Sequence, residues 1–134
     1  NLDYVEQTVT GSNDVQQAVQ SIVTRCDAIY IPTDNTFASA MPLVGSVVME
    51  SGTPVICGAT GMVEAGGLIT LGLNYYNLGY QTGEMAAQVL EGADPASMPV
   101  QSQNQYDYVV NEEMLSALGM ELPQSLLEKM GDAA

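Results

Sequence analysis

Four short loops contain the residues of this chain that are best suited to bind a small molecule. Their candidate ligand-binding residues are Ser12, Asn13, Asp34, Asn35, Thr36, Thr60 and Tyr75. The Asp34 carboxylate is predicted to act as counter-ion for an ammonium group, and the Tyr75 ring can stack on a ligand. Helices are predicted to begin in these loops, so free backbone N–H groups there attract anions. The alternative role of Asn13 and Asp34 is helix capping, which both residue types favour.

The apolar residues switch repeatedly between strand-like and helix-like spacing, which predicts alternating strands and helices. Strands are predicted at residues 4–9, 28–31, 54–57 and 68–73, with 108–110 as a further candidate. Helical segments are predicted at residues 15–23, 37–50, 62–65 and 75–91, and two short ones at 112–118 and 123–130. Ser12 or Asn13 is expected to cap the first helix, and Pro42 to kink the second or begin its second part.

This order predicts an α/β fold, a doubly wound parallel sheet of four to five strands with helices on both faces and a flavodoxin-like topology. The short and nearly all-apolar strands agree with a sheet that is covered on both sides. Ligands bind such sheets outside the carboxyl ends of the strands, which is where the four loops are expected. Residues 1–92 are predicted to form the ligand-binding lobe. Residues 93–134 are predicted to be a connector with a terminal strand and helices that pack on that lobe.

Composition excludes several classes of function. The 134 residues suit one domain, and their net charge of -14 argues against nucleic acid or anionic lipid as a partner. His is absent, which removes the usual proton shuttle, His-based metal sites and Ser-His-Asp triads. We therefore expect a non-enzymatic protein without a cofactor or a metal site. Cys26 and Cys57 each lie beside an apolar run, which favours buried free thiols over a disulfide.

Longer stretches of the chain resemble a known family. They are SNDVQQAVQSIVTRCDAIYIPTDNT, TPVICG, LNYYNLGYQTGEMAAQVLEG and VVNEEMLSALGMELPQSLL, in this order along nearly the whole chain. The segments IYIPTDNT, NYYNLGYQTGEMAAQVLEG and LGMELPQSLL are the most specific. They resemble the ABC transporter substrate-binding family related to the tryptophan/tyrosine-type binding lipoproteins.

The resemblance implies a two-lobed protein of type I periplasmic-binding-protein architecture, of which this chain resembles the second lobe and the terminal segment. The resemblance implies that an N-terminal lobe, missing from this sequence, completes the protein. Members of the family lie outside the cytoplasmic membrane, as periplasmic proteins or membrane-anchored lipoproteins, and deliver their ligand to the membrane permease of an ABC importer. Characterised relatives favour aromatic amino acids, which implies an amino acid bound in a cleft between the lobes.

The resemblance also assigns roles to two loops. The family's Asp-Asn-Thr loop suggests that Asp34 binds the ammonium group, while the helix starts near Asn13 and Asn35–Thr36 supply N–H donors for the carboxylate. The family pattern often has an acidic residue after the third strand. This chain has Gly58-Ala59-Thr60-Gly61 there instead.

Two other functions fit parts of the sequence. Residues 8–12, Thr-Val-Thr-Gly-Ser, match much of the phosphate loop with which flavodoxin-like electron carriers bind FMN, although Asn13 replaces the usual Thr and Trp is absent. The effector lobe of a transcription regulator shares the same fold. A phosphoacceptor receiver domain is set aside, because Gly58-Ala59-Thr60 follows the third predicted strand in place of the Asp it needs and the sole Lys, Lys129, is near the carboxyl terminus.

Overall fold

The computed structural model describes residues 2–132 and contains two compact units. The first, here called the sheet unit, extends up to Gly72 and continues from Tyr108 onward. The second, here called the α4 unit, is Leu73–Asp107. The predicted boundary at residue 92 falls inside the α4 unit, and the functional division proposed there stays a prediction.

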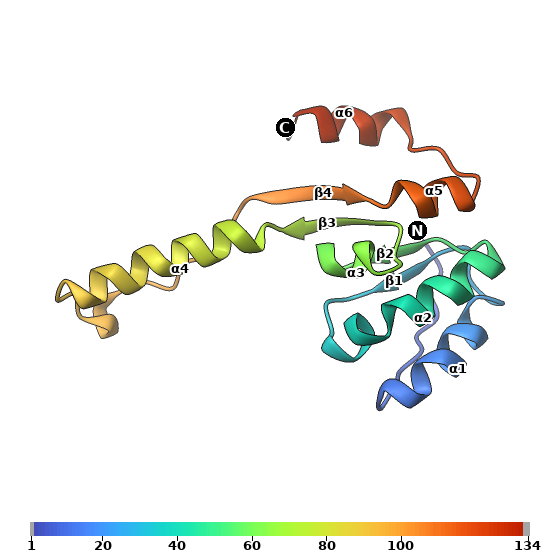
Figure 1. The fold of residues 1–134 in the computed structure, drawn as a ribbon, viewed down its shortest axis with the longest axis horizontal. Helices are drawn as coiled ribbons and strands as arrows, with labels where there is room; N and C mark the ends of the chain where they lie inside the picture. The colour runs from blue at the N-terminus through green and yellow to red at the C-terminus, as the bar shows by residue number, and fades with distance from the viewer. Residues whose placement is uncertain (1, 133–134) are drawn as a thin grey trace. The chain divides into compact units, whose positions relative to one another are not determined.

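The sheet is mixed and has four strands in the order β1-β2-β3-β4. They are β1 (Ile29–Ile31), β2 (Val55–Cys57), β3 (Ile69–Leu73) and β4 (Tyr106–Val110). The first three are parallel, with Ile31 opposite Cys57 in the register of β1 and β2. The arrow of β4 points the opposite way to that of β3 (Figure 1). Four of the five predicted strands are therefore confirmed, and so is the α/β fold with helices on both sides.

The predicted first strand is wrong. Residues 2–9 form no strand, and their side chains are exposed except for the half-buried Val9. Leu2 and Tyr4 are 94% and 82% exposed. A flavodoxin-like order would place a strand between β1 and β2, but these two pair directly. With no partner to take up its N–H and C=O groups, alternation alone does not make residues 4–9 a strand.

Helices connect the parallel strands as predicted. These are α2 (Asn35–Ser51), between β1 and β2, and α3 (Thr60–Glu64), between β2 and β3. Helix α1 (Ser12–Ile22) precedes β1, and α5 (Glu112–Ala117) and α6 (Gln124–Asp132) follow β4. Helix α2 continues through Pro42, so Pro42 lies inside one helix and does not begin a second one. The helix ends at Gly52, which adopts a left-handed conformation with φ of 75°. Such a C-terminal glycine has no Cβ to clash with the helix backbone.

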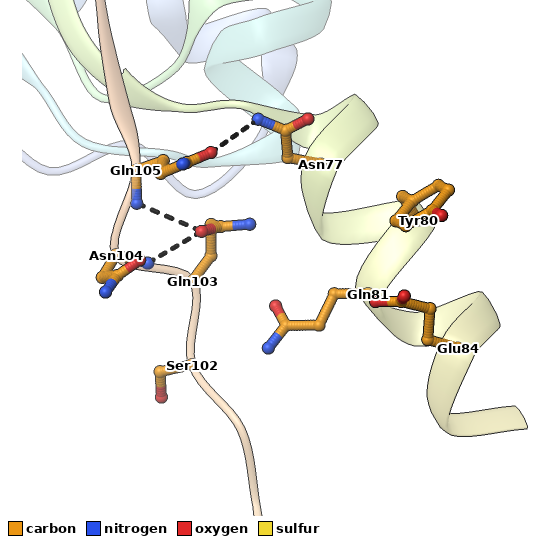
Figure 2. Close-up of a pocket in the computed structure, with 8 residues that line it drawn as sticks. All are labelled: Asn77, Tyr80, Gln81, Glu84, Ser102, Gln103, Asn104 and Gln105. Atoms are coloured by element: carbon orange, nitrogen blue, oxygen red, sulfur yellow. Dashed lines mark hydrogen bonds between the residues drawn. The ribbon is translucent and has the colours of Figure 1, made fainter. Parts of the chain in front are cut away.

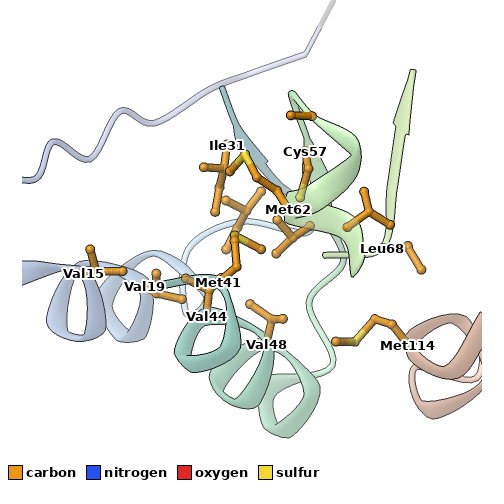
Figure 3. Close-up of a cluster of buried hydrophobic side chains, with 14 residues drawn as sticks. Val15, Val19, Ile31, Met41, Val44, Val48, Cys57, Met62, Leu68 and Met114 are labelled. Atoms are coloured by element: carbon orange, nitrogen blue, oxygen red, sulfur yellow. The ribbon is translucent and has the colours of Figure 1, made fainter. Parts of the chain in front are cut away.

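The core of the sheet unit is made of the inner faces of α1 and α2, the strands and α3 (Figure 3). Its fully buried side chains include Val15, Met41, Val44, Val48, Val55, Met62 and Val63. Met114 adds a contact from α5. Apolar residues at helical spacing in α1 and α2 thus bury one face of each helix, which fixes where their amino ends lie.

The α4 unit consists of α4 (Tyr75–Leu90), the 3-10 helix η1 (Pro95–Ser97) and the segment that returns to β4. Three side-chain hydrogen bonds tie α4 and its capping residue Asn74 to the return segment and the start of β4. They run from Asn74 to Asp107 at 2.7 Å, from Asn77 to Gln105 at 2.9 Å and from Gln81 to Gln101 at 2.8 Å. No residue of α4 is buried. Among residues 2–132, no helix has both the length and the apolar character needed to cross a membrane.

Candidate functional site

The loops after β1 and β2 touch each other. The Gly58 N–H donates to the Ile31 carbonyl at 2.9 Å, which extends the pairing of the two strands by one residue. A Cβ atom at Gly58 would lie 2.5 Å from the Thr33 nitrogen and 2.7 Å from its Oγ1. Only a glycine fits there. The structure therefore brings together two of the four loops that the sequence analysis selected.

Asp34 is exposed and caps α2. Its Oδ1 accepts a hydrogen bond from the Phe37 N–H at 3.0 Å. Asp34 thus has the helix-capping role that the sequence analysis gave as the alternative to ligand binding. Within residues 2–132 the second carboxylate oxygen, Oδ2, has no hydrogen-bond partner. Capping thus leaves one oxygen of Asp34 free to accept from a ligand. Asn35 beside it is exposed and Thr36 is half-buried.

Ser12 and Asn13 lie in the first turn of α1, where both are exposed. The prediction that one of them caps this helix is wrong. The capping position is occupied by Gly11, which has no side chain to accept a bond. Asp14 instead accepts hydrogen bonds from the Thr10 hydroxyl and from the Thr10 N–H, and these hold the pKa of its carboxyl below the usual value. The first N–H groups of α1 are left without a side-chain cap.

Helices α1 and α2 pack on each other and run in the same direction (Figure 1). Both amino ends lie on the side toward which β1 and β3 point. The amino end of α1 is therefore on the same side of the sheet unit as Asp34.

Thr60 is the first residue of α3 and is half-buried. A Cβ atom at Gly72 would lie 3.3 Å from the Thr60 Oγ1, so the end of β3 adjoins the start of α3. Loops 33–36 and 58–61 and the end of β3 thus form a continuous rim, here called the strand-end rim. No hydrogen bond joins the predicted site residues of different loops within residues 2–132. Tyr75 begins α4 in the other unit and is 57% exposed, so its part in a shared site stays a prediction.

Neither cysteine is bonded to the other. Both are free thiols, of which Cys26 is half-buried and Cys57, the last residue of β2, is buried. Burial raises the pKa of the Cys57 thiol to about 11. At neutral pH this thiol stays protonated, and it serves as a small apolar group in the core.

Nearly the whole chain matches a protein family. The model of the ABC transporter substrate binding protein family matches residues 1–133. The chain belongs to this family.

Similar proteins include substrate-binding proteins of known ligand. The chain is 39% identical over 121 residues to the tyrosine-binding protein of Clostridioides difficile strain R20291, a match that covers 90% of this chain and 35% of the relative. This chain therefore spans about a third of the length of the tyrosine-binding protein.

Two solved structures agree with this assignment. A domain from Streptococcus pneumoniae in complex with L-Trp has a TM-score of 0.82 and 38% identity, and the match covers 92% of this chain and 42% of that one. The ligand-free, open structure of a Clostridium difficile substrate binding protein with adhesive properties has a TM-score of 0.70 and 47% identity, covering 90% and 41%. The family resemblance deduced from the sequence is confirmed.

The sequence analysis missed one hollow of this substrate-binding protein chain, in the α4 unit. It has a volume of about 430 Å³ and lies between one face of α4 and the return segment (Figure 2). Its lining residues are Asn77, Tyr80, Gln81, Glu84, Ser102, Gln103, Asn104 and Gln105. The sequence analysis took residues 93–105 for a plain connector. The dense run of amides from Gln101 to Gln105 marks a segment rich in hydrogen-bonding groups, but it does not predict that the segment lies along α4.

Proposed function

We propose that this chain is the second lobe of the solute-binding component of an ABC importer, and that its ligand is an aromatic amino acid. The observation that carries the proposal is the strand-end rim, where Asp34 caps α2 with one carboxylate oxygen and the preceding residue, Thr33, contacts Gly58. The component works outside the cytoplasmic membrane, as a periplasmic protein or an anchored lipoprotein, and hands its ligand to a membrane permease. No catalytic role is assigned to it.

The chemistry of the rim suits a zwitterion. The Asp34 Oδ2 accepts from the ligand ammonium group, since Oδ1 is already bonded to the Phe37 N–H. The uncapped N–H groups at the start of α1, beside Ser12 and Asn13, receive the ligand carboxylate. With only two basic residues in the chain, backbone N–H groups are the main donors for an anionic group.

Aromatic selectivity is supported by the relatives. One is named a tyrosine-binding protein and another is solved with L-Trp. In this chain Tyr75 and Tyr76 begin α4 and are 57% and 81% exposed. We assign one of these rings to stacking on the aromatic side chain of the ligand.

The exposed apolar face of α4 is the surface on which we expect the first lobe to pack. The apolar stripe of this helix comprises Leu78, Met85, Ala86, Val89 and Leu90, and none of these residues is buried. The most exposed of the larger side chains among them, Leu90, is 88% exposed. An amphipathic helix gains most of its stability by burying such a stripe. We propose that the first lobe covers it, and that ligand bound between the lobes stabilises the closed form by its higher affinity for that form.

Titration calorimetry with L-tyrosine, L-tryptophan and L-phenylalanine tests the proposal. The two-lobed polypeptide that contains this chain is expected to bind at least one of them with micromolar affinity, and L-alanine much more weakly. The isolated 134-residue chain is expected to show weak or undetectable binding, because it supplies only half of the contacts. A two-lobed polypeptide that is folded and binds none of the three amino acids contradicts the aromatic assignment.

A further inference from the structure

The hollow in the α4 unit is lined mainly by amide side chains, unlike the strand-end rim. Asn77, Tyr80, Gln81 and Glu84 follow each other at helical spacing, so one face of α4 forms one wall. The other wall is residues 102–105 of the return segment (Figure 2). This polar face of α4 is distinct from the apolar stripe that is assigned to the first lobe.

Hydrogen bonds within the unit fix the two walls relative to each other. The Asn77 Nδ2 donates to the Gln105 Oε1 at 2.9 Å, and the Gln81 Nε2 donates to the Gln101 Oε1 at 2.8 Å. The Gln103 Oε1 accepts from the backbone N–H groups of Asn104 at 2.9 Å and Gln105 at 3.1 Å. These bonds order a segment that has no strand or helix of its own, which gives the hollow a defined lining.

Each of these amides keeps unused hydrogen-bonding capacity. A primary amide has two donors and an acceptor with two lone pairs, and the bonds above use only part of them. Within residues 2–132, the Nε2 groups of Gln103 and Gln105, the Oδ1 of Asn77 and the whole side-chain amide of Asn104 have no hydrogen-bond partner. The lining therefore offers both donors and acceptors at close range.

Charge narrows the class of ligand. Residues 73–107 contain no Lys or Arg, and Glu84 lines the hollow, so an anion is repelled. An ammonium group has donors only, and it would leave the amide NH₂ groups of Gln103 and Gln105 unmatched. A neutral hydroxyl both donates and accepts and therefore matches the mixed lining.

Tyr80 supplies an apolar surface in the same hollow. Tyr80 lines the edge of the hollow, where its side chain is 63% exposed and its ring lies on the side of α4 away from the return segment (Figure 2). The negative face of an aromatic ring attracts positively polarised hydrogens, such as the C–H groups on one face of a sugar ring. The hollow has a volume of about 430 Å³ and is wide open to solvent, so a ligand there stays partly exposed. We propose that this hollow binds a neutral saccharide, separately from the amino acid at the strand-end rim.

Saturation-transfer NMR on the 134-residue chain tests this site with the methyl glycosides of glucose, galactose and N-acetylglucosamine as probes. Spermidine and L-tyrosine are the comparison probes. At least one glycoside is expected to receive saturation. Its binding should also shift the side-chain NH₂ signals of Gln103 and Asn104 in ¹⁵N spectra, while both comparison probes leave these signals unchanged.

Two variants and a control locate the site. Asn104→Ala and Tyr80→Ala are each expected to weaken glycoside binding by about tenfold, the factor that a lost contact of ordinary strength produces. Gln88→Ala changes an exposed amide of the same helix outside the hollow and should leave the affinity unchanged. Circular dichroism checks that every variant is folded.

Three results overturn the saccharide site. The first is that no glycoside binds the folded chain. The second is equal glycoside affinity in the wild-type chain and in the Asn104→Ala and Tyr80→Ala variants. The third is tighter binding of spermidine than of every glycoside, which assigns the hollow to cations instead. None of them affects the amino-acid site, which uses different residues and a different ligand.

Discussion

Gly58 and Thr33 are in such close contact that a Cβ atom on Gly58 would lie 2.5 Å from the Thr33 backbone nitrogen. The two residues follow neighbouring parallel strands, and the Gly58 N–H also bonds to the Ile31 carbonyl at 2.9 Å. This contact places the start of the Asp34 loop directly beside the loop after β2. The position of Asp34 on the strand-end rim therefore depends on a glycine at residue 58.

Gly58→Ala is expected to lower the free energy of unfolding by about 1–3 kcal/mol, the usual cost of forcing extra volume into a packed site. The clash is with backbone, which cannot move aside as a flexible side chain does. Urea denaturation followed by circular dichroism measures the loss. Gly61→Ala is the matched control, because a Cβ atom there meets nothing within 4 Å. Equal stability of the two variants contradicts the contact.

Asp34→Ala is expected to cost about 1 kcal/mol of stability, because α2 loses the oxygen that caps the Phe37 N–H. Asp34→Asn keeps a capping oxygen and should unfold at nearly the wild-type urea concentration. The pair separates the structural role of the side chain from its charge. An Asn variant as unstable as the Ala variant shows that the carboxylate charge, rather than the cap, stabilises the helix.

The buried thiol of Cys57 has a pKa of about 11, whereas the ordinary value is 9.0. Between these values the folded chain holds a proton that the unfolded chain releases, so stability due to Cys57 is complete below pH 9.0 and falls toward pH 11. Denaturation across this range should show a steeper loss in the wild-type chain than in Cys57→Ala. Parallel curves contradict the shift. The difference between the two proteins removes the contribution of every other group.

Hydrogen exchange of α4 tests whether its apolar stripe is covered. In the 134-residue chain, backbone amides of α4 should exchange faster than those of α2. The reason is that α2 buries Met41, Val44 and Val48, whereas α4 has no buried residue. In the two-lobed polypeptide the same α4 amides should become protected. Unchanged exchange of α4 in the larger protein contradicts the assignment of the stripe to the first lobe.

The periodicity of the sequence was sufficient for most of the sheet unit. Short apolar runs ending in Pro32 or Gly58 predicted β1 and β2 to within a residue, because a strand that is buried on both faces has little room for polar residues. Helical spacing predicted α1, α2 and α4 for a similar reason. The strand at residues 4–9 failed because alternation reports the character of the side chains and not whether a partner strand is present.

The candidate site was harder to predict from the sequence than the fold was. Asp34 was identified by its residue type, and that type suits a cap and a ligand contact equally well. Which residue caps α1 could not be deduced, because Gly11, Ser12 and Asn13 are all acceptable at that position. The hollow beside α4 depends on the return segment lying along one helix face, and side-chain bonds between residues about 20 to 33 positions apart hold it there. Local patterns do not contain that information.

The most direct test of the amino-acid site is the affinity of the two-lobed polypeptide for L-tyrosine with Asp34→Asn, measured by titration calorimetry. The variant is expected to bind about tenfold more weakly or worse, because a hydrogen bond to a charged group contributes about 1.5–3 kcal/mol. Asp27→Asn removes the same charge from the exposed turn before β1 and should bind as the wild type does. Wild-type affinity in a folded Asp34→Asn variant, or micromolar binding by the isolated 134-residue chain, contradicts the account.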